Sequence, residues 1–249
     1  MKISIHNCKR ELEQTPELLE TLGIAQKQFQ FKNIQLPYCE KIVNGDLPGE
    51  PVLVMVLHGA GSVGHDNFAQ IRIPAEPLIR FLERTSRKYL LLFPQCEKGF
   101  QWVDVPWNST SHTLPEQPSE YMAAALALLD EKSAGHKVST RAALGISMGG
   151  YGAWDIACRR HFDLLGIMCG GADTTQANRF NSTRICIYHG TDDNAVPVCR
   201  GRDMAEALKR AGCKDFRYKE FPATGHNVWD AFFFDGEALP YLFKSLFSR

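Results

Sequence analysis

The sequence lacks a long apolar run and an apolar leader. No stretch approaches the roughly 18 consecutive apolar residues that a transmembrane helix needs, and the apolar runs that are present have the length of strands. The first residues, MKISIHNCKRELEQ, contain no apolar segment of the kind that defines a secretory signal peptide. We therefore expect no membrane span and a cytoplasmic location.

The sequence also lacks an excess of charge of either sign. It has 28 Lys and Arg residues against 28 Asp and Glu residues, and its pI is near 7.1. Such a balance argues against a strongly basic surface that would bind nucleic acid or an anionic membrane. We expect a small-molecule partner and no nucleic acid, and the sequence leaves the oligomeric state open between monomer and dimer.

Motifs for metals and nucleotides are scarce as well. There are eight cysteines among 249 residues, but no two have the C-x-x-C spacing of a structural zinc site. A chain of this length can bury a large core without disulfides, so free buried thiols are the better interpretation. A cluster of His58, His65 and Asp66 lacks ligand spacing on a regular element, and no G-x-x-x-x-G-K-[ST] motif occurs. We expect neither a metal nor a cofactor.

The most informative stretch that is present is residues 144–154, LGISMGGYGAW. It contains a G-x-S-x-G pattern centred on Ser147, between an apolar segment at 141–144 and a small-residue helix at 150–157. A strand, a tight turn with glycines and a helix form the context of a nucleophile elbow, which exposes a serine hydroxyl at the sheet edge. The alternative is a glycine-rich turn with an incidental serine.

Strand and helix patterns alternate after residue 50. Apolar or alternating runs predict strands at 52–57, 89–93, 141–144, 164–169, 184–188 and 216–221, and helices at 74–88, 119–134, 150–157, 200–211 and beyond 225. Before them we expect a helix at 10–21 and a hairpin or edge pair at 28–43, with Pro37 placing it at an edge. The pattern predicts one doubly wound α/β domain over 1–249, with residues 1–27 as a helical extension and 103–118 as a loop over the active site.

A serine nucleophile needs a base, and the base needs an orienting acid. In sheets of this type the three follow in the order serine, acid, histidine, each after a strand. Ser147 is followed by the adjacent pair Asp192 and Asp193 and then by His226, which lies in a loop after the last strand. Asp173, after the preceding strand, is a weaker candidate acid. We expect His189 to brace its strand end and His58 to hydrogen-bond within its own loop. The remaining histidines are expected at the surface: His6, His65, His112, His136 and His161.

A glycine-rich loop at 58–67 follows the strand at 52–57. Its position favours one half of an oxyanion hole, supplied by the backbone N–H of Ala60 or Gly61. The alternatives are a phosphate-binding loop or a plain turn. Aromatic residues near the expected site, Trp102 and Trp229 above all, are candidate walls of the substrate pocket together with Gly61.

Several blocks together resemble the α/β-hydrolases. These blocks are LHGAGSVGHDN at 57–67, FPQCEKGFQW at 93–102, GISMGGYGAWDIA at 145–157, HGTDDNAVPV at 189–198 and GHNVWDAFF at 225–233. The chain is most similar to single-domain esterases and predicted peptidases near the dienelactone hydrolase, feruloyl esterase and polyhydroxyalkanoate depolymerase groups. The resemblance implies a mostly parallel sheet with helices on both faces and no separate cap domain.

The same resemblance implies roles for individual residues. In the family pattern H-G-x-x-D-x-x-V-P the acid is the fifth position, which is Asp193 here, and the base matches His226. The oxyanion donors match the backbone N–H groups of Ala60 and Met148. One departure is Ser62-Val63, which replaces a Glu-Arg pair common among these relatives and weakens any inference about specificity from that loop.

The sequence thus predicts a serine hydrolase that cleaves carboxylic esters through a Ser147–His226–Asp193 triad and an acyl-enzyme intermediate, without a metal or organic cofactor. Two alternatives stay open. One is a serine peptidase acting on small peptides, and the other is a catalytically silent α/β-hydrolase that binds a small molecule.

Overall fold

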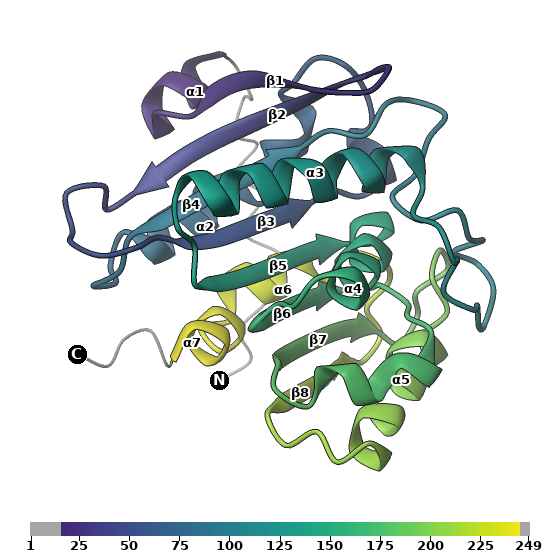
Figure 1. Ribbon diagram of the computed structural model, residues 1–249. Helices are drawn as coiled ribbons and strands as arrows, with labels where there is room; N and C mark the ends of the chain where they lie inside the picture. Colours follow the sequence, from purple (N-terminus) through teal and green to yellow (C-terminus); the bar gives the residue numbers. More distant parts are fainter. Residues whose placement is uncertain (1–15, 245–249) are drawn as a thin grey trace.

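The computed structural model describes residues 16–244, and eight strands form one sheet in it (Figure 1). The strands are β1 (Ala25–Phe31), β2 (Ile34–Val43), β3 (Val52–Leu57), β4 (Tyr89–Pro94), β5 (Thr140–Ile146), β6 (Leu164–Met168), β7 (Arg184–Gly190) and β8 (Phe216–Phe221). Their order is β1-β2-β4-β3-β5-β6-β7-β8. Strands β3 to β8 pair in parallel, whereas β2 pairs antiparallel with both β1 and β4.

Helices cover both faces of this sheet. Strand β3 shows why, because Leu53, Met55 and Leu57 enter one buried cluster and the alternating Val52, Val54 and Val56 enter the other. The first face is covered by α3 (Glu120–Gly135), α4 (Met148–Arg159) and α5 (Cys199–Arg210), and the second by α1 (Pro16–Leu22), α2 (Ala75–Leu82), α6 (Trp229–Phe234) and α7 (Ala238–Phe243). The predicted fold class is confirmed, and no separate cap is present among the described residues.

The described elements refine the boundaries of two helices predicted from sequence. The helix predicted at 74–88 ends at Leu82, because the Asn44 side-chain amide donates to the carbonyls of Leu82, Thr85 and Arg87 and so replaces the next helical turn. Of the helix predicted at 10–21, residues 10–15 lie outside the described part; the rest belongs to α1. Gly23 follows α1 at φ +59°, a left-handed conformation that suits glycine at a helix end.

The hairpin predicted at 28–43 is confirmed, but Pro37 does not lie on the edge strand. Strand β1 is the edge, and β2 lies between β1 and β4. Pairing of β2 with β4 starts at Tyr38, opposite Pro94, so Pro37 sits one residue outside that ladder. A proline has no N–H to donate within a central strand. Because Pro37 lies outside the pairing of β2 with β4, that pairing loses no hydrogen bond.

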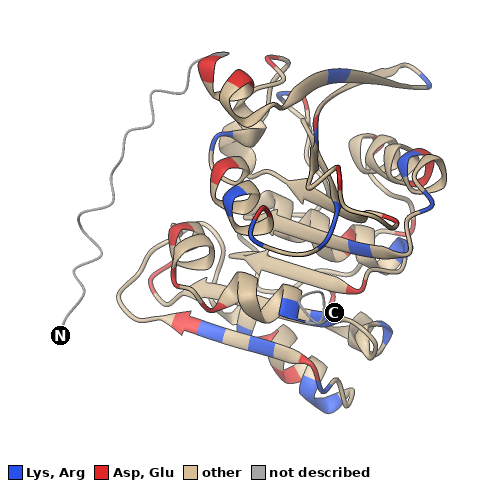
Figure 2. Cartoon of the chain, turned by 90° about the vertical axis from the view of Figure 1, so that its left-hand side faces the viewer, with Lys and Arg blue, Asp and Glu red and all other residues tan. Residues whose placement is uncertain are grey.

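Charged residues of both signs are interspersed over the outside of the molecule in the view of Figure 2. Within residues 16–244, no helix has the length and the apolar composition that crossing a bilayer requires. The seven described cysteines are all free thiols, as expected, and most of them are buried: Cys39, Cys96, Cys158, Cys169, Cys186, Cys199 and Cys213.

Candidate active site

Ser147 lies at a sharp turn between β5 and α4. Its backbone has φ +54° and ψ −116°, an unusual conformation for a residue other than glycine. Close packing explains the flanking glycines, since a Cβ at Gly145 would lie 2.0 Å from the Gly149 carbonyl oxygen, and one at Gly149 would lie 1.9 Å from the Leu57 oxygen. The local sequence therefore forms the predicted elbow, which leaves the Ser147 side chain partly exposed at the sheet edge.

Three side chains form a continuous hydrogen-bonded chain at this edge. The Ser147 hydroxyl lies 2.7 Å from Nε2 of His226, and Nδ1 of His226 lies 2.7 Å from Oδ2 of Asp193. A carboxylate accepts only, so Nδ1 of His226 carries the hydrogen and Nε2 is free to accept from the serine. The structure thus brings together three residues that lie far apart in the sequence and puts them in the order and geometry of a catalytic triad.

The Asp193 side chain is fully buried and fully hydrogen-bonded. Its Oδ1 accepts from the backbone N–H groups of Ala195 and Val196, each at 2.9 Å. Burial alone would raise the pKa of this carboxyl, but hydrogen bonds from His189, His226 and the two backbone groups outweigh it and hold the pKa well below its usual range. Asp193 is therefore an anion at neutral pH and stabilises a positive charge on His226.

His189 was expected to brace the end of its strand, and in the structure it also contacts the Asp193 carboxylate directly. Its Nε2 lies 3.0 Å from the Val196 carbonyl oxygen and 3.3 Å from Oδ2 of Asp193, so a single N–H faces two acceptors. The His189 side chain is completely buried. It holds the turn that carries Asp193 and contacts the same carboxylate oxygen, Oδ2, as His226 does.

The other two candidate acids are used elsewhere. Asp192 is exposed, and its Oδ1 accepts from the neighbouring Thr191 hydroxyl at 2.9 Å. Asp173 is buried and accepts from the backbone N–H groups of Thr175 and Leu114. The structure therefore places Asp193, and neither of these, against the histidine.

The loop at 58–67 packs against the elbow. A Cβ at Gly59 would lie 3.4 Å from the Ser147 Cβ, so the two backbones are neighbours at the site. Within the described residues, the backbone N–H groups of Ala60 and Met148 donate to no acceptor in the protein. Ala60 is the first residue of a short 3-10 turn, Ala60–Ser62, and Met148 is the first residue of α4. Free N–H groups on either side of a serine can stabilise negative charge that develops on a substrate oxygen.

His58 holds this loop in place, as expected. Burial lowers the pKa of His58 to about 4, so the ring is neutral at neutral pH. Its Nε2 accepts from the Cys96 N–H at 2.9 Å, and its Nδ1 therefore donates to the Gly59 carbonyl at 2.7 Å.

The same loop has a feature that would suit phosphate binding, because Gly59, Gly61 and Gly64 have the G-x-G-x-x-G spacing. The structure argues against it, since the strand is followed by a three-residue 3-10 turn and not by the helix whose N-terminus binds the phosphates in that motif.

Trp102 corrects the expectation of a substrate contact. Its side chain is 0% exposed, its indole N–H donates to the His58 carbonyl at 3.1 Å, and it packs where a Cβ at Gly152 would lie. It therefore supports the loop that carries Ala60 from within the core. Trp229 keeps a place beside the site, because its ring lies 5.8 Å from the His226 ring in an edge-on arrangement. Gly61 is exposed next to Ala60, so it remains available to a substrate.

Among the described residues, neither of two candidate groups of metal ligands has the geometry of a metal site. His65 pairs with Glu97 at 2.6 Å, and Asp66 accepts from the backbone N–H groups of Phe68 and Ala69, so neither converges with buried His58. Among the described residues, Cys169, Asp193 and His226 are the one group with suitable spacing. Their Nδ1–Oδ2 separation of 2.7 Å is that of a hydrogen bond, whereas two ligands of one tetrahedral zinc ion would lie about 3.3 Å apart.

Sequence reasoning missed four residues close to this site. Cys169, directly after β6 with φ +50°, donates its thiol to the His226 carbonyl at 2.9 Å. Tyr151, one turn of α4 beyond Ser147, and Arg200, on α5, pack against each other. His112 was expected at the surface but is half-buried and contacts Arg200 through Nδ1. The position of Cys169 at the end of a parallel strand was the one available signal, since such ends meet at one edge.

Comparisons with known proteins agree with this geometry. A family model described as Phospholipase/Carboxylesterase matches residues 37–236. No curated protein matches the sequence. A solved thermostable esterase has 25% sequence identity and a TM-score of 0.76, over 89% of this chain and 62% of that one. The present chain therefore spans less than two thirds of that esterase.

Other solved structures are similar in fold at lower identity. A putative dienelactone hydrolase from Klebsiella pneumoniae has a TM-score of 0.56 at 17% identity, over 90% of this chain and 96% of that one. A serine hydrolase without a lid from Xanthomonas campestris has a TM-score of 0.57 at 14% identity, over 91% and 96%. The match to the family model covers most of the described sheet. The chain therefore belongs to the phospholipase/carboxylesterase family and has the α/β-hydrolase fold.

Proposed function

We propose that the protein hydrolyses carboxylic esters of small molecules through Ser147, His226 and Asp193, with a covalent acyl-enzyme intermediate. The observation that carries the proposal is the pair of 2.7 Å hydrogen bonds that link Ser147 to His226 and His226 to Asp193. Membership of the phospholipase/carboxylesterase family supports the choice of esters as substrates.

The reaction follows from the hydrogen-bond directions. Ser147 attacks the ester carbonyl carbon while its proton passes to Nε2 of His226. The tetrahedral intermediate then collapses, the carbon–oxygen bond to the alcohol breaks, and His226 returns the proton to the leaving alkoxide. Water, deprotonated by the same nitrogen, attacks the acyl-serine and releases the carboxylic acid. Asp193, held as an anion, keeps the hydrogen on Nδ1 and stabilises the imidazolium in both steps.

The backbone N–H groups of Ala60 and Met148 receive the negative charge that develops on the carbonyl oxygen. They are free of other acceptors among the described residues, and both lie next to the elbow. One such donor contributes about 3 kcal/mol to transition-state stabilisation in other serine hydrolases, where removal costs a hundredfold or more in rate. Two preorganised donors therefore account for a large part of the expected acceleration.

Labelling by a fluorophosphonate is the test of this proposal. The reagent phosphonylates an activated serine and leaves ordinary hydroxyls unmodified. We expect a single adduct on the peptide that contains Ser147, no adduct in Ser147→Ala, and competition by short-chain p-nitrophenyl esters. Absence of an adduct on the folded native protein would contradict the proposal and favour a silent binding protein. A peptide p-nitroanilide tested beside the esters separates amide hydrolysis from ester hydrolysis.

A further inference from the structure

Arg200 is a buried cation without a carboxylate partner among the described residues. Its residue is 3% exposed, although arginine is seldom buried unless it is paired. The guanidinium lies 5.4 Å from the centre of the Tyr151 ring and directly below Gly171, where a Cβ would approach Nε to 2.4 Å. Such a charge is costly to bury, so its retention calls for a role beyond packing.

The groups that surround the guanidinium come from separate segments. Its Nη1 donates to the Thr110 carbonyl at 3.0 Å, and its Nη2 donates to the Ala172 carbonyl at 3.3 Å and contacts Nδ1 of His112. Burial, and then the charge of Arg200, lower the pKa of His112 to about 4. The ring is therefore neutral at neutral pH, and its Nδ1 accepts from Arg200. One side chain of α5 thus connects loop 103–118 to the segment that follows β6.

Further contacts fasten the same loop on both sides of Arg200. The Tyr151 hydroxyl donates to the Trp107 carbonyl at 2.9 Å, and the Leu114 N–H donates to Asp173 at 2.8 Å. Arg159 donates to the carbonyls of Pro115 and Glu116. The anchors lie on α4, which directly follows Ser147, on α5 and after β6. Figure 1 shows the loop at the edge toward which the parallel strands point, the edge of the triad. Fastened in this way, the loop is a fixed wall.

We propose that Arg200 is the positioning residue that fixes loop 103–118 as a wall of the ester-binding site and thereby limits the size of the ester that is accepted. This inference rests on the proposed esterase function. Within the loop, Trp107 is 39% exposed and offers an apolar surface to a substrate. Loss of the Arg200 contacts leaves the loop attached through Trp107 and through residues 114–116. The part of the loop between these attachments is then free to move, so that larger acyl or alcohol groups fit.

The test compares Arg200→Met with the matched variant Arg202→Met. Arg202 lies on the same helix, but it is exposed and pairs with Glu220 at 2.8 Å, so it has no contact with the loop. Methionine fills a similar buried space without a charge, and replacing buried ionic groups by apolar ones is often neutral for stability. Amide hydrogen exchange over residues 103–118 is measured in both variants, together with kcat and KM for p-nitrophenyl esters from acetate to laurate and for acetates of small and large alcohols.

We expect faster exchange in the loop of Arg200→Met, and at least a fivefold weaker discrimination between small and large esters in one of the two series, mainly through KM. Arg202→Met keeps native exchange and native discrimination. Unchanged loop exchange in Arg200→Met, or faster exchange with unchanged discrimination in both series, overturns the inference. If Arg200→Met fails to fold, His112→Ala takes its place, because it removes one of the two contacts of Arg200 with the loop, with a smaller effect in the same direction expected. If the native protein hydrolyses no ester while hydrogen exchange in the loop still depends on Arg200, the proposed function and the limit on ester size are both overturned. Only the structural role of Arg200 in holding the loop then stands.

Discussion

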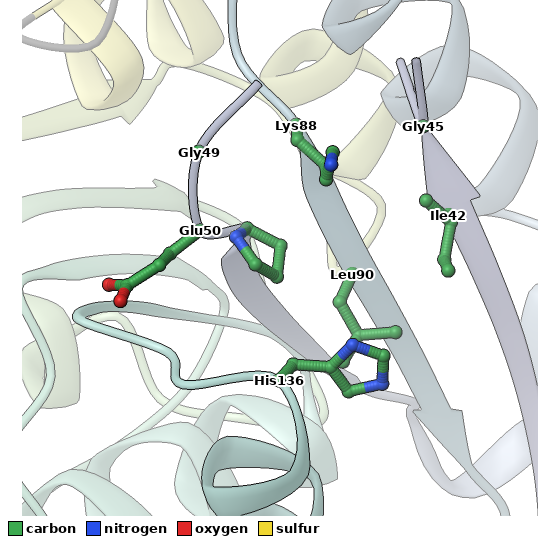
Figure 3. Close-up of a pocket in the computed structure, with 8 residues that line it drawn as sticks. Ile42, Gly45, Gly49, Glu50, Lys88, Leu90 and His136 are labelled. Carbon is green, nitrogen blue, oxygen red and sulfur yellow. The ribbon is translucent and has the colours of Figure 1, made fainter. Parts of the chain in front are cut away.

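The two ends of the parallel strands differ in the chemistry of the residues that lie there. At the carboxyl ends of the parallel strands lie the strained Ser147 backbone and the hydrogen-bonded side chains of Ser147, His226 and Asp193. At the opposite end, a hollow of about 350 Å³ is lined by Ile42, Gly45, Gly49, Glu50, Pro51, Lys88, Leu90 and His136 (Figure 3). In Figure 3 the charged and ring groups of Glu50, Lys88 and His136 do not converge on one point.

This difference shows that a hollow alone does not make a reaction site. The triad end has a fully buried carboxylate whose pKa is held below its usual range, and this carboxylate contacts the buried His189 and the partly exposed His226. Desolvated and mutually hydrogen-bonded groups of this kind are what active sites require. The titratable groups that line the hollow, those of Glu50, Lys88 and His136, are not buried, so we assign the chemistry to the first end.

The largest effect is expected from Asp193→Asn. The amide cannot hold the hydrogen on Nδ1 of His226, and the corresponding change in another triad enzyme lowers kcat by about 10⁴. Asp192→Asn is the matched control, because Asp192 is its neighbour in sequence but has an exposed side chain that accepts from the Thr191 hydroxyl. Steady-state ester hydrolysis measures both. Comparable losses in the two variants would show that the acid has been assigned to the wrong residue.

The glycines of the two ends should respond very differently to alanine. At Gly149 a Cβ would lie 1.9 Å from the Leu57 carbonyl oxygen, so Gly149→Ala should cost more than about 4 kcal/mol of the free energy of unfolding. At Gly135, which ends α3 near the hollow, a Cβ meets no atom within 4 Å. Gly135→Ala should be neutral or stabilising by up to about 1 kcal/mol. Denaturant unfolding distinguishes them, and equal stability would contradict the close packing of the elbow.

Removal of His189 should have a moderate effect that depends on pH. His189→Leu takes away one hydrogen bond to the Asp193 carboxylate, and hydrogen bonds to charged groups contribute about 1.5–3 kcal/mol, equivalent to a rate loss of roughly 10 to 100-fold. The pKa of Asp193 is depressed, so its stabilisation is present above the unfolded pKa and is lost as the pH falls through the folded pKa. Without His189 that folded pKa rises, and acid unfolding begins at a higher pH. His136→Leu, at the other end of the sheet, should leave both the rate and the acid transition unchanged.

The smallest effect is expected at the hollow. Lys88→Met changes a group that faces the hollow and lies at the opposite end of the sheet from the triad. Surface substitutions of this kind usually change stability by less than about 0.5 kcal/mol. We expect kcat/KM for esters within twofold of the native value. A larger loss would show that the two ends are coupled and would remove the contrast between them.

The parts of the molecule that sequence predicted are those specified by local patterns. Buried strands such as Val52–Leu57 are continuous apolar runs, and the elbow at Ser147 needs glycines at fixed positions. The choice of Asp193 over Asp192 came from the family pattern, because two adjacent carboxylates cannot be told apart by composition. The structure shows the physical difference, which is the turn that aims two backbone N–H groups at Asp193.

The parts that sequence could not predict depend on contacts between distant segments. Trp102 was expected to touch substrate, yet its burial is set by the missing side chain of Gly152 and by the His58 carbonyl. The end of α2 depends on Asn44, which comes from another loop. Arg200 contacts Thr110, which lies 90 residues earlier in the sequence. No local pattern marks such a contact.

The central claim is that Ser147 is the nucleophile of an esterase, and hydrolysis of p-nitrophenyl butyrate by the native protein and by Ser147→Ala tests it most directly. Both proteins are first shown to be folded by circular dichroism and thermal unfolding. The account predicts turnover by the native protein and a loss of at least about 10⁴-fold in kcat in the variant, as for nucleophile removal in other triad enzymes. Equal turnover by the two folded proteins, or none by the native one on any ester of the series, would contradict it.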